Sequence, residues 1–283
     1  MISVGGLRRE LRSIANPEKA KLLQRFFKTG KGEYAEGDLF LGIMVPQSRE
    51  IAKKYSGLDL RQLKELIASK FHEERLIALF ILINKYKTTN HKKIIFHFYL
   101  KNMKYINNWD LVDLSAPGIV GEHLYAINSR LTHSLDNSLE PSGNTSIKNK
   151  YKSFSSAGRY PLKDLKETLK KLSREESRAI DVLFCLANSK SIWERRIAVL
   201  ATFQFVKYRR FGESLMLAEM LLNDQHDLIH KAVGWMLREV GKRDVDTEIE
   251  FLDKYSSKMP RTMLRYAIER FPEKLRMAYL KKK

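Results

Sequence analysis

Small residues recur inside strongly helical segments at a nearly constant spacing, and this recurrence constrains the fold more than any other feature. Ala198, Gly234 and Ala267 each follow a basic or polar position and precede an apolar one, at intervals of roughly 33 to 36 residues. Ala78 has similar neighbours, and the segment 109–113 follows it by about one such period. The spacing predicts an all-α solenoid, a curved stack of antiparallel helix pairs whose second helices line a concave binding surface.

The rest of the chain fits this organisation. Segments 74–82 and 196–201 have broad apolar surfaces with helical periodicity, and alternation with a period of two is hard to find. The stretch 129–156 is rich in Ser, Asn and Lys, which is typical of a mobile insertion between repeats. We therefore expect a single domain over residues 1–283 with a flexible insertion at about 129–173.

Local signals mark the ends of two helices. Ser191 with Glu194 three residues later matches a capping box. Asp227 can cap a helix that Gly241 is well placed to end. Both helices belong to the predicted repeats, so the caps and the period agree.

The most informative short segment runs from Asn108 to Pro117. Asn108 can cap a helix that carries Trp109 and Asp113 four residues apart, so the indole and the carboxylate share one face. Pro117 has no N–H to donate, which predicts that this helix kinks or ends just beyond Asp113. A packing Trp and a charge that complements the helix dipole would explain the same pattern without a function.

Charge indicates the kind of partner. The chain carries a formal net charge of +19, a balance typical of nucleic-acid binding. An aromatic ring beside a carboxylate on such a scaffold suggests a site for a cationic group on a polyanion. Hydrophobic residues make up 43% and charged residues 30% of the chain, which places it with globular proteins.

Several other function classes are disfavoured. No apolar run is long enough to span a bilayer, and residues 1–10 lack the apolar core of a secretory signal. The only cysteine, Cys185, lies in an apolar run and reads as a core residue, so we expect a reducing, cytoplasmic location. The glycines of the loop 28–38 follow no predicted strand, which argues against a nucleotide-binding loop. His226 and His230 have a zinc-compatible spacing but no evident third ligand, which favours capping or surface roles.

Four segments together carry a family resemblance. Residues 40–46 (FLGIMVP), 108–113 (NWDLVD), 192–196 (IWERR) and 231–239 (KAVGWMLRE) resemble, in order, the AlkD-like DNA alkylation repair glycosylases. The segment from about 129 to 173 is longer than expected for that family.

The resemblance implies a HEAT-like superhelix that grips duplex DNA and removes cationic N3- or N7-alkylated purines without a metal, a cofactor or base flipping. Asp113 matches the family's catalytic carboxylate, and Trp109 and Trp235 match the aromatic pair that contacts the sugar. Arg196 and Arg238 match residues that contact the DNA backbone near the lesion.

We also expect Lys231 and Arg195 to bind DNA, and a monomer that acts in the cytoplasm on bacterial nucleoid DNA, away from membranes. Without the resemblance, Trp235 reads as a core residue and Trp193 as packing. Two alternatives stay open: a non-catalytic binder of DNA structures on the same scaffold, and a helical scaffold for acidic proteins.

Overall fold

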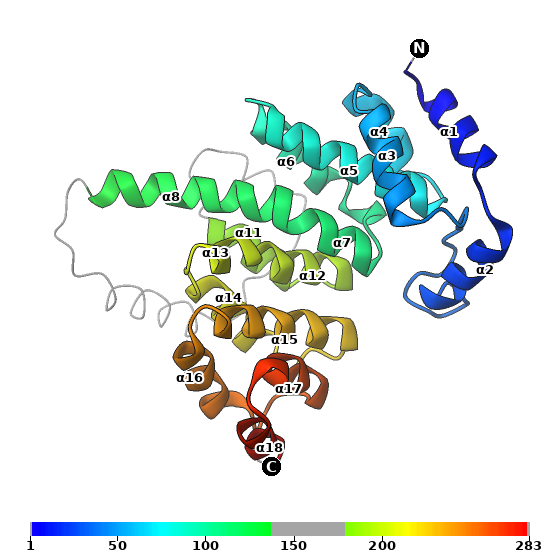
Figure 1. Cartoon of the computed structure of the whole chain (residues 1–283). Coiled ribbons are helices and arrows are strands. Elements are labelled where there is room, and N and C mark those ends of the chain that lie inside the picture. Colours follow the sequence, from blue (N-terminus) through cyan, green and yellow to red (C-terminus); the bar gives the residue numbers. More distant parts are fainter. Residues whose placement is uncertain (1, 137–178, 282–283) are drawn as a thin grey trace. The chain divides into compact units, whose positions relative to one another are not determined.

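Helices make up nearly all of the regular structure in the computed structural model, which describes residues 2–136 and 179–281 (Figure 1). Neither range contains a β-strand, although an isolated parallel bridge joins Leu39 to Phe71. The all-α prediction is confirmed. None of the described helices is long and apolar enough to cross a membrane.

The chain divides into two compact units, Met1–His123 and Leu124–Lys283. The helices of the first unit are α1 (Val4–Ser13), α2 (Pro17–Phe26), α3 (Val45–Lys54), α4 (Leu60–Ile67), α5 (His72–Thr88), α6 (Lys92–Lys101), the 3₁₀ turn η1 (Met103–Tyr105), α7 (Trp109–Ala116) and the π-helical turn η2 (Pro117–Gly121).

The division between the units falls at the start of α8 (Glu122–Asp136). The later helices are α11 (Ala179–Ala187), α12 (Ile192–Ala201), α13 (Phe203–Lys207), α14 (Gly212–Met220), α15 (Asp227–Gly241), α16 (Val245–Tyr255), α17 (Arg261–Ala267), the 3₁₀ turn η3 (Ile268–Arg270) and α18 (Glu273–Lys281). Residues 129–136 of the predicted insertion are helical in α8, and its remainder lies outside the described residues.

Helix α5 is the centre of the first unit, because it packs against α3, α4, α6 and α7. Its residues 76–79 and 81–82 are all buried, as the apolar run in the sequence predicts. A helix that is apolar on nearly every side must be surrounded by other elements. The start of α5 therefore lies where several segments of this unit converge, and the candidate site forms there.

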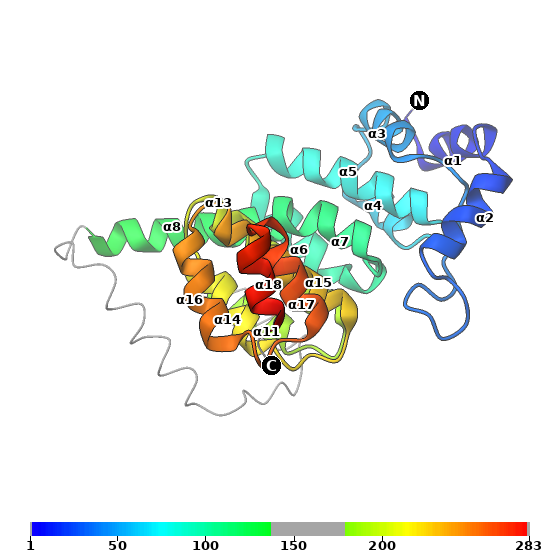
Figure 2. The ribbon, with the colours of Figure 1, turned by 60° about the horizontal axis from the view of Figure 1, so that its bottom comes forward.

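Helix α15 has the same central place in the second unit, where it packs against α12, α16 and α17. Figure 1 shows α12, α15 and α17 in succession, and Figure 2 again shows α15 beside α17. These helices carry Ala198, Gly234 and Ala267, all buried. A Cβ added to Gly234 would lie 2.4 Å from the carbonyl oxygen of Met263, so the glycine lets α15 and α17 approach closely. The predicted period therefore marks helix crossings.

Two predicted caps need correction. Helix α12 begins after Ser191, but the Ser191 side chain makes no cap hydrogen bond. Instead, Ser189 Oγ accepts from the backbone N–H of Ser191 at 3.0 Å and donates to Glu194 at 2.5 Å. Helix α15 is capped by His226, whose Nδ1 accepts from the N–H of Leu228, and Asp227 is its first residue.

Helix α15 ends at Gly241, as predicted. A Cβ at Gly241 would lie 1.6 Å from the carboxylate of Glu248 on α16, so a larger residue there would displace that side chain. Burial raises the pKa of the Glu248 carboxyl to about 8. The last turn of α15 thus packs closely against α16.

Candidate functional site

Helix α7 carries the Trp–Asp pair that the sequence singles out. The side chain of Asn108 accepts a hydrogen bond from the backbone N–H of Trp109 at 2.8 Å, so the predicted cap is confirmed. The helix ends at Ala116, and Pro117 begins a π-helical turn, in which its missing N–H is tolerated. The predicted break after Asp113 is therefore confirmed, and Trp109 and Asp113 lie one helical turn apart.

Trp109 is half-buried and belongs to an aromatic stack. Its ring lies 5.3 Å from that of Phe27 at an interplanar angle of 20°, and Phe27 stacks in turn on Phe40 at 5.1 Å. The exposed ring of Phe26 meets Trp109 edge-on at 6.1 Å. Trp109 is thus held by packing on one side and keeps part of its surface accessible.

Asp113 is half-buried next to a neutral pair of hydroxyl groups. Tyr99 is fully buried and shares a 2.9 Å hydrogen bond with Ser115. Burial raises the pKa of the Tyr99 phenol, the bond to Ser115 lowers it, and the negative charge of Asp113 raises it again. The phenol therefore stays neutral and does not add a charge beside the Asp113 carboxylate.

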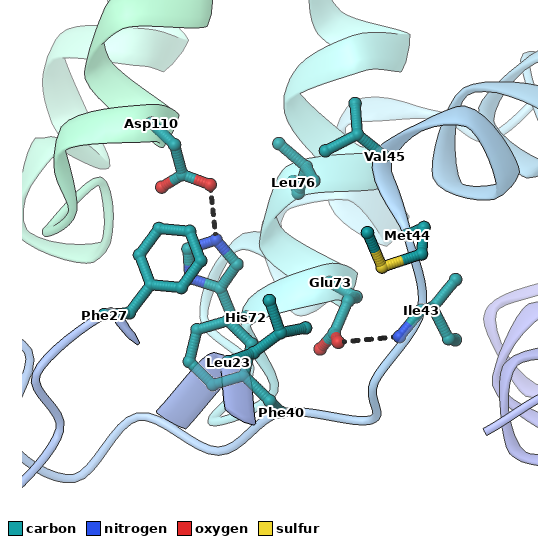
Figure 3. A pocket seen from close by; sticks show the side chains of 10 residues that line it. All are labelled: Leu23, Phe27, Phe40, Ile43, Met44, Val45, His72, Glu73, Leu76 and Asp110. Carbon is teal, nitrogen blue, oxygen red and sulfur yellow. Dashed lines mark hydrogen bonds and ion pairs between the residues drawn. The ribbon is translucent and has the colours of Figure 1, made fainter. Parts of the chain in front are cut away.

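Behind Trp109 lies a buried network of charged side chains that the sequence analysis did not identify. Figure 3 shows two of its members, His72 and Asp110. The His72 Nε2 atom lies 2.7 Å from Asp110 Oδ2, and its Nδ1 lies 3.8 Å from Asp38 Oδ2. Arg75 donates to the same Asp38 oxygen at 2.5 Å. Asp110 directly follows Trp109, so this network joins the starts of α5 and α7.

The loop that supplies Asp38 and Phe40 is fixed to the start of α5. The N–H of His72 donates to the carbonyl of Leu39 at 2.8 Å. The buried Glu73 carboxylate accepts hydrogen bonds of 2.9 to 3.2 Å from the backbone N–H groups of residues 41–43. Gly42 has a φ of +79°, and a Cβ there would lie 2.1 Å from a backbone oxygen of α2's N-cap. The motif 40–46 therefore shapes the wall of the site.

A small cavity opens among these elements (Figure 3). Its volume of about 50 Å³ compares with roughly 300–1,000 Å³ for typical small-molecule pockets. It is lined by Leu23, Phe27, Phe40, Ile43, Met44, Val45, His72, Glu73, Leu76 and Asp110. Its size suits a few water molecules rather than a whole ligand.

Trp235 lies on α15 in the second unit and is half-buried rather than a core residue. Its Nε1–H donates to Glu239 Oε1 at 3.3 Å. Lys242 donates to the same oxygen at 2.5 Å, and Arg243 donates to Glu239 Oε2 at 3.0 Å. Burial alone would raise the pKa of Glu239, but the bonds from Lys242 and Arg243 lower it overall. The ionised Glu239 carboxylate therefore holds the N–H edge of the Trp235 indole in place.

The predicted DNA-binding cations of α12 and α15 already have partners within the second unit. Arg238 forms an ion pair with Glu269, and Arg196, only 5% exposed, donates to the carbonyl of Leu228. The remaining pairs join Arg195 to Asp224 at 2.6 Å and Lys231 to Asp227 at 2.7 Å.

Four residues that the sequence assigns to packing, capping or surface roles make structural contacts in the second unit: Trp193, Cys185, His226 and His230. Trp193 is 9% exposed, and Cys185 is buried with its thiol pKa raised to about 11 by burial. His226 caps α15, and His230 lies 2.5 Å from the carbonyl oxygen of Asp224. Within residues 2–136 and 179–281, no group of three or more His, Cys, Asp or Glu side chains could hold a metal ion.

The structure thus brings Trp109 together with Asp113 in the first unit, and gathers the α12 and α15 residues in the second. The sequence model of the family described as "DNA alkylation repair enzyme" matches residues 7–137 and 164–271. The chain belongs to this family. Family membership supports an enzyme with DNA as its substrate and a role in the repair of alkylated DNA.

A solved structure shares the fold of this family member. The "predicted DNA alkylation repair enzyme from Enterococcus faecalis" is 13% identical, with a TM-score of 0.58. The similarity covers 92% of this chain and 97% of that one. No curated protein sequence matches with significance.

Proposed function

We propose that the chain is a DNA glycosylase that hydrolyses the N-glycosidic bond of cationic N3- or N7-alkylated purines in duplex DNA. The observation that carries this proposal is the Trp109–Asp113 pair on one face of α7, in a chain that belongs to a DNA alkylation repair family. Half-burial of both side chains supports a site where charge is only partly screened by water.

The chemistry requires one carboxylate. Most glycosidases use a carboxylic acid to protonate the leaving group and a second carboxylate to support the sugar. A purine alkylated at N3 or N7 already carries a positive charge, so it can leave as a neutral base without a general acid. The ionised Asp113 would stabilise the oxocarbenium-like sugar and orient the attacking water.

The two half-buried indoles would assist the same step. As positive charge moves from the base onto the sugar, cation–π attraction to Trp109 or Trp235 would contribute about 0.5 to 2 kcal/mol each. These contacts act on the sugar, so the damaged base need not be flipped into a protein pocket. The small volume of the cavity behind Trp109 is consistent with such a mechanism.

The cations of α12 and α15 would hold the phosphates. The phosphate oxygens, which bind guanidinium and ammonium groups strongly, would replace the present partners of Arg196, Arg238, Lys231 and Arg195. The net charge of +19 would supply long-range attraction to DNA. We propose that the monomer needs neither a metal nor a cofactor for this reaction.

Release of a free base tests the proposal. The full-length chain is incubated with a duplex that contains one N7-methylguanine and, as a control, with the same duplex without the lesion. We expect free 7-methylguanine and an abasic site only from the damaged duplex. Tight binding without release of base would favour the alternative, a non-catalytic binder of DNA structures.

A further inference from the structure

The buried charges behind Trp109 balance only when one histidine is protonated. His72 is 2% exposed and is the first residue of α5. The charged groups that face it are Asp38 from the preceding loop, Arg75 from α5 and Asp110 from α7. Two carboxylates against one guanidinium leave a net negative charge, which a protonated imidazole would neutralise. An uncompensated buried charge is strongly destabilising.

The directions of the pKa shifts of His72 and Asp38 agree with this charge balance. Burial lowers the pKa of His72, but the hydrogen bond to Asp110 and the nearby Asp38 carboxylate outweigh it, so the pKa is raised above 6.5. Burial alone would raise the pKa of Asp38, whereas His72 and Arg75 hold it below its usual value. The network therefore favours a protonated His72 beside an ionised Asp38.

The His72 imidazole also packs against the aromatic stack that supports Trp109. Its ring lies 4.6 Å from that of Phe40 at an interplanar angle of 18°, and 5.0 Å from that of Phe27. Phe27 in turn stacks on Trp109 at 5.3 Å. Trp109 is thus connected to His72 in two ways, through the aromatic stack and through its sequence neighbour Asp110.

We propose that His72 is a positioning residue for Trp109: it anchors the first turn of α7 through Asp110 and supports the indole through Phe40 and Phe27. The catalytic consequence of this role rests on the proposed glycosylase function, whereas the positioning itself concerns the free protein. His72 acts through other side chains.

The role gives Trp109 a pH dependence of defined sign. Because the folded-state pKa of His72 is raised, the stabilisation from its proton is fully present below about 6.5 and is lost as pH rises through the folded-state value. A neutral imidazole can still donate Nε2–H to Asp110, but it leaves Asp38 with Arg75 alone. The packing behind Trp109 should then loosen at alkaline pH.

Nuclear magnetic resonance of the indole N–H of Trp109 in the free chain tests this directly. The Trp109→Phe variant assigns the signal among three tryptophans. Between about pH 5 and pH 9, we expect the signal to shift with one-proton behaviour and a midpoint above the ordinary histidine value. In His72→Gln the shift should vanish, whereas His91→Gln, which changes an exposed histidine, should retain it.

A second variant covers the case in which His72→Gln fails to fold. Asp110→Asn keeps the size of the side chain but removes one negative charge beside His72, so the midpoint should move to lower pH. Single-turnover base release should fall on the order of 10-fold in either variant, with little change in DNA affinity, because a displaced group affects the reaction more than binding.

The two proposals fail in distinguishable ways. A Trp109 signal that titrates in His72→Gln as in wild type, or a midpoint unchanged in Asp110→Asn, would overturn the positioning role. If the signal follows His72 but wild type releases no base, the positioning role is supported and the glycosylase proposal is overturned.

Discussion

At the scale of single residues, the cations expected on DNA are restrained before DNA arrives. Arg238 is paired with Glu269, whose side chain is half exposed, and Arg195 is paired with the buried Asp224. An exposed ion pair contributes little to stability, so Arg238 can exchange Glu269 for a phosphate at small cost. Arg195, which also donates to two carbonyl groups of the preceding loop, is much more constrained.

We therefore expect opposite effects from the two sides of the exposed pair. Arg238→Ala should weaken binding to damaged and undamaged duplexes alike and reduce the slope of log K against log salt by roughly one unit. Glu269→Gln should strengthen binding, because it releases Arg238 for the phosphates. Titration of duplex DNA at several salt concentrations measures both effects. Arg276→Ala on α18 is the control variant, because it removes one positive charge at another site. A wild-type slope in Arg238→Ala would show that this arginine does not touch the backbone.

Short-range features of the residues were largely predictable from sequence. The Asn108 cap and the break at Pro117 depend on neighbours within a few positions, and both predictions are confirmed. The predicted capping box at Ser191 was wrong. The hydroxyl group of Ser189, two residues earlier, hydrogen-bonds to the Ser191 N–H and to the Glu194 carboxylate instead. No short-range rule could pair His72 with Asp110, 38 residues away.

One signal for that network was present in the sequence. Residues 72–75 (HEER) are four consecutive ionisable residues immediately before an apolar helical run, and all four are buried. Buried charges must be paired, so such a run predicts partners elsewhere in the chain. It does not identify them, since that depends on how the loop 28–40 folds against α5.

At the scale of helices, the repeated small residues identify where the elements cross. Gly234 lies against α17, with Tyr266 and Ala267 within reach of any added Cβ. A larger residue would separate two helices that pack through their backbones. Part of the period was readable in the sequence because the α15–α17 crossing needs small residues, and Gly234 lies against Ala267 there. The superhelix of the whole chain stays a prediction.

Substitution at the crossing should therefore cost stability. Gly234→Ala should lower the free energy of unfolding by about 1–3 kcal/mol, because the new methyl group overlaps the Met263 carbonyl. Gly5→Ala on α1 is the matched control: its nearest neighbour would be an Arg9 side-chain atom at 3.7 Å, so helix propensity should leave it neutral or slightly stabilised. Urea denaturation of both variants measures the difference. Equal stabilities would contradict the close approach.

At the scale of the whole molecule, a polycation that binds DNA must also choose a lesion. If no pocket encloses the damaged base, steric fit cannot determine which lesions the protein removes. The positive charge of the alkylated purine would then be the selecting property, since it weakens the glycosidic bond whatever group was added. Such a base can leave without the carboxylic acid that most glycosidases use to protonate the leaving group.

The selection should follow lesion charge and be tolerant of lesion size. We expect release of N7-methylguanine and of a much bulkier cationic N7 adduct, and no release of uracil or 1,N6-ethenoadenine. Trp109→Ala and Trp235→Ala should slow both cationic substrates by similar factors. Chromatography of released bases from matched duplexes gives the comparison. Efficient release of a neutral base, or no activity on the bulky adduct, would indicate a flipping pocket instead.

The most direct test of the account is single-turnover release of 7-methylguanine by Asp113→Asn. The change removes one charge at the centre of the proposed mechanism, and we expect the rate to fall by on the order of 10² or more, the scale for loss of one preorganised electrostatic group. Affinity for the duplex should change little, and Asp246→Asn, which removes an exposed charge from α16, should react as wild type. A rate within a few-fold of wild type in Asp113→Asn would contradict the proposed mechanism.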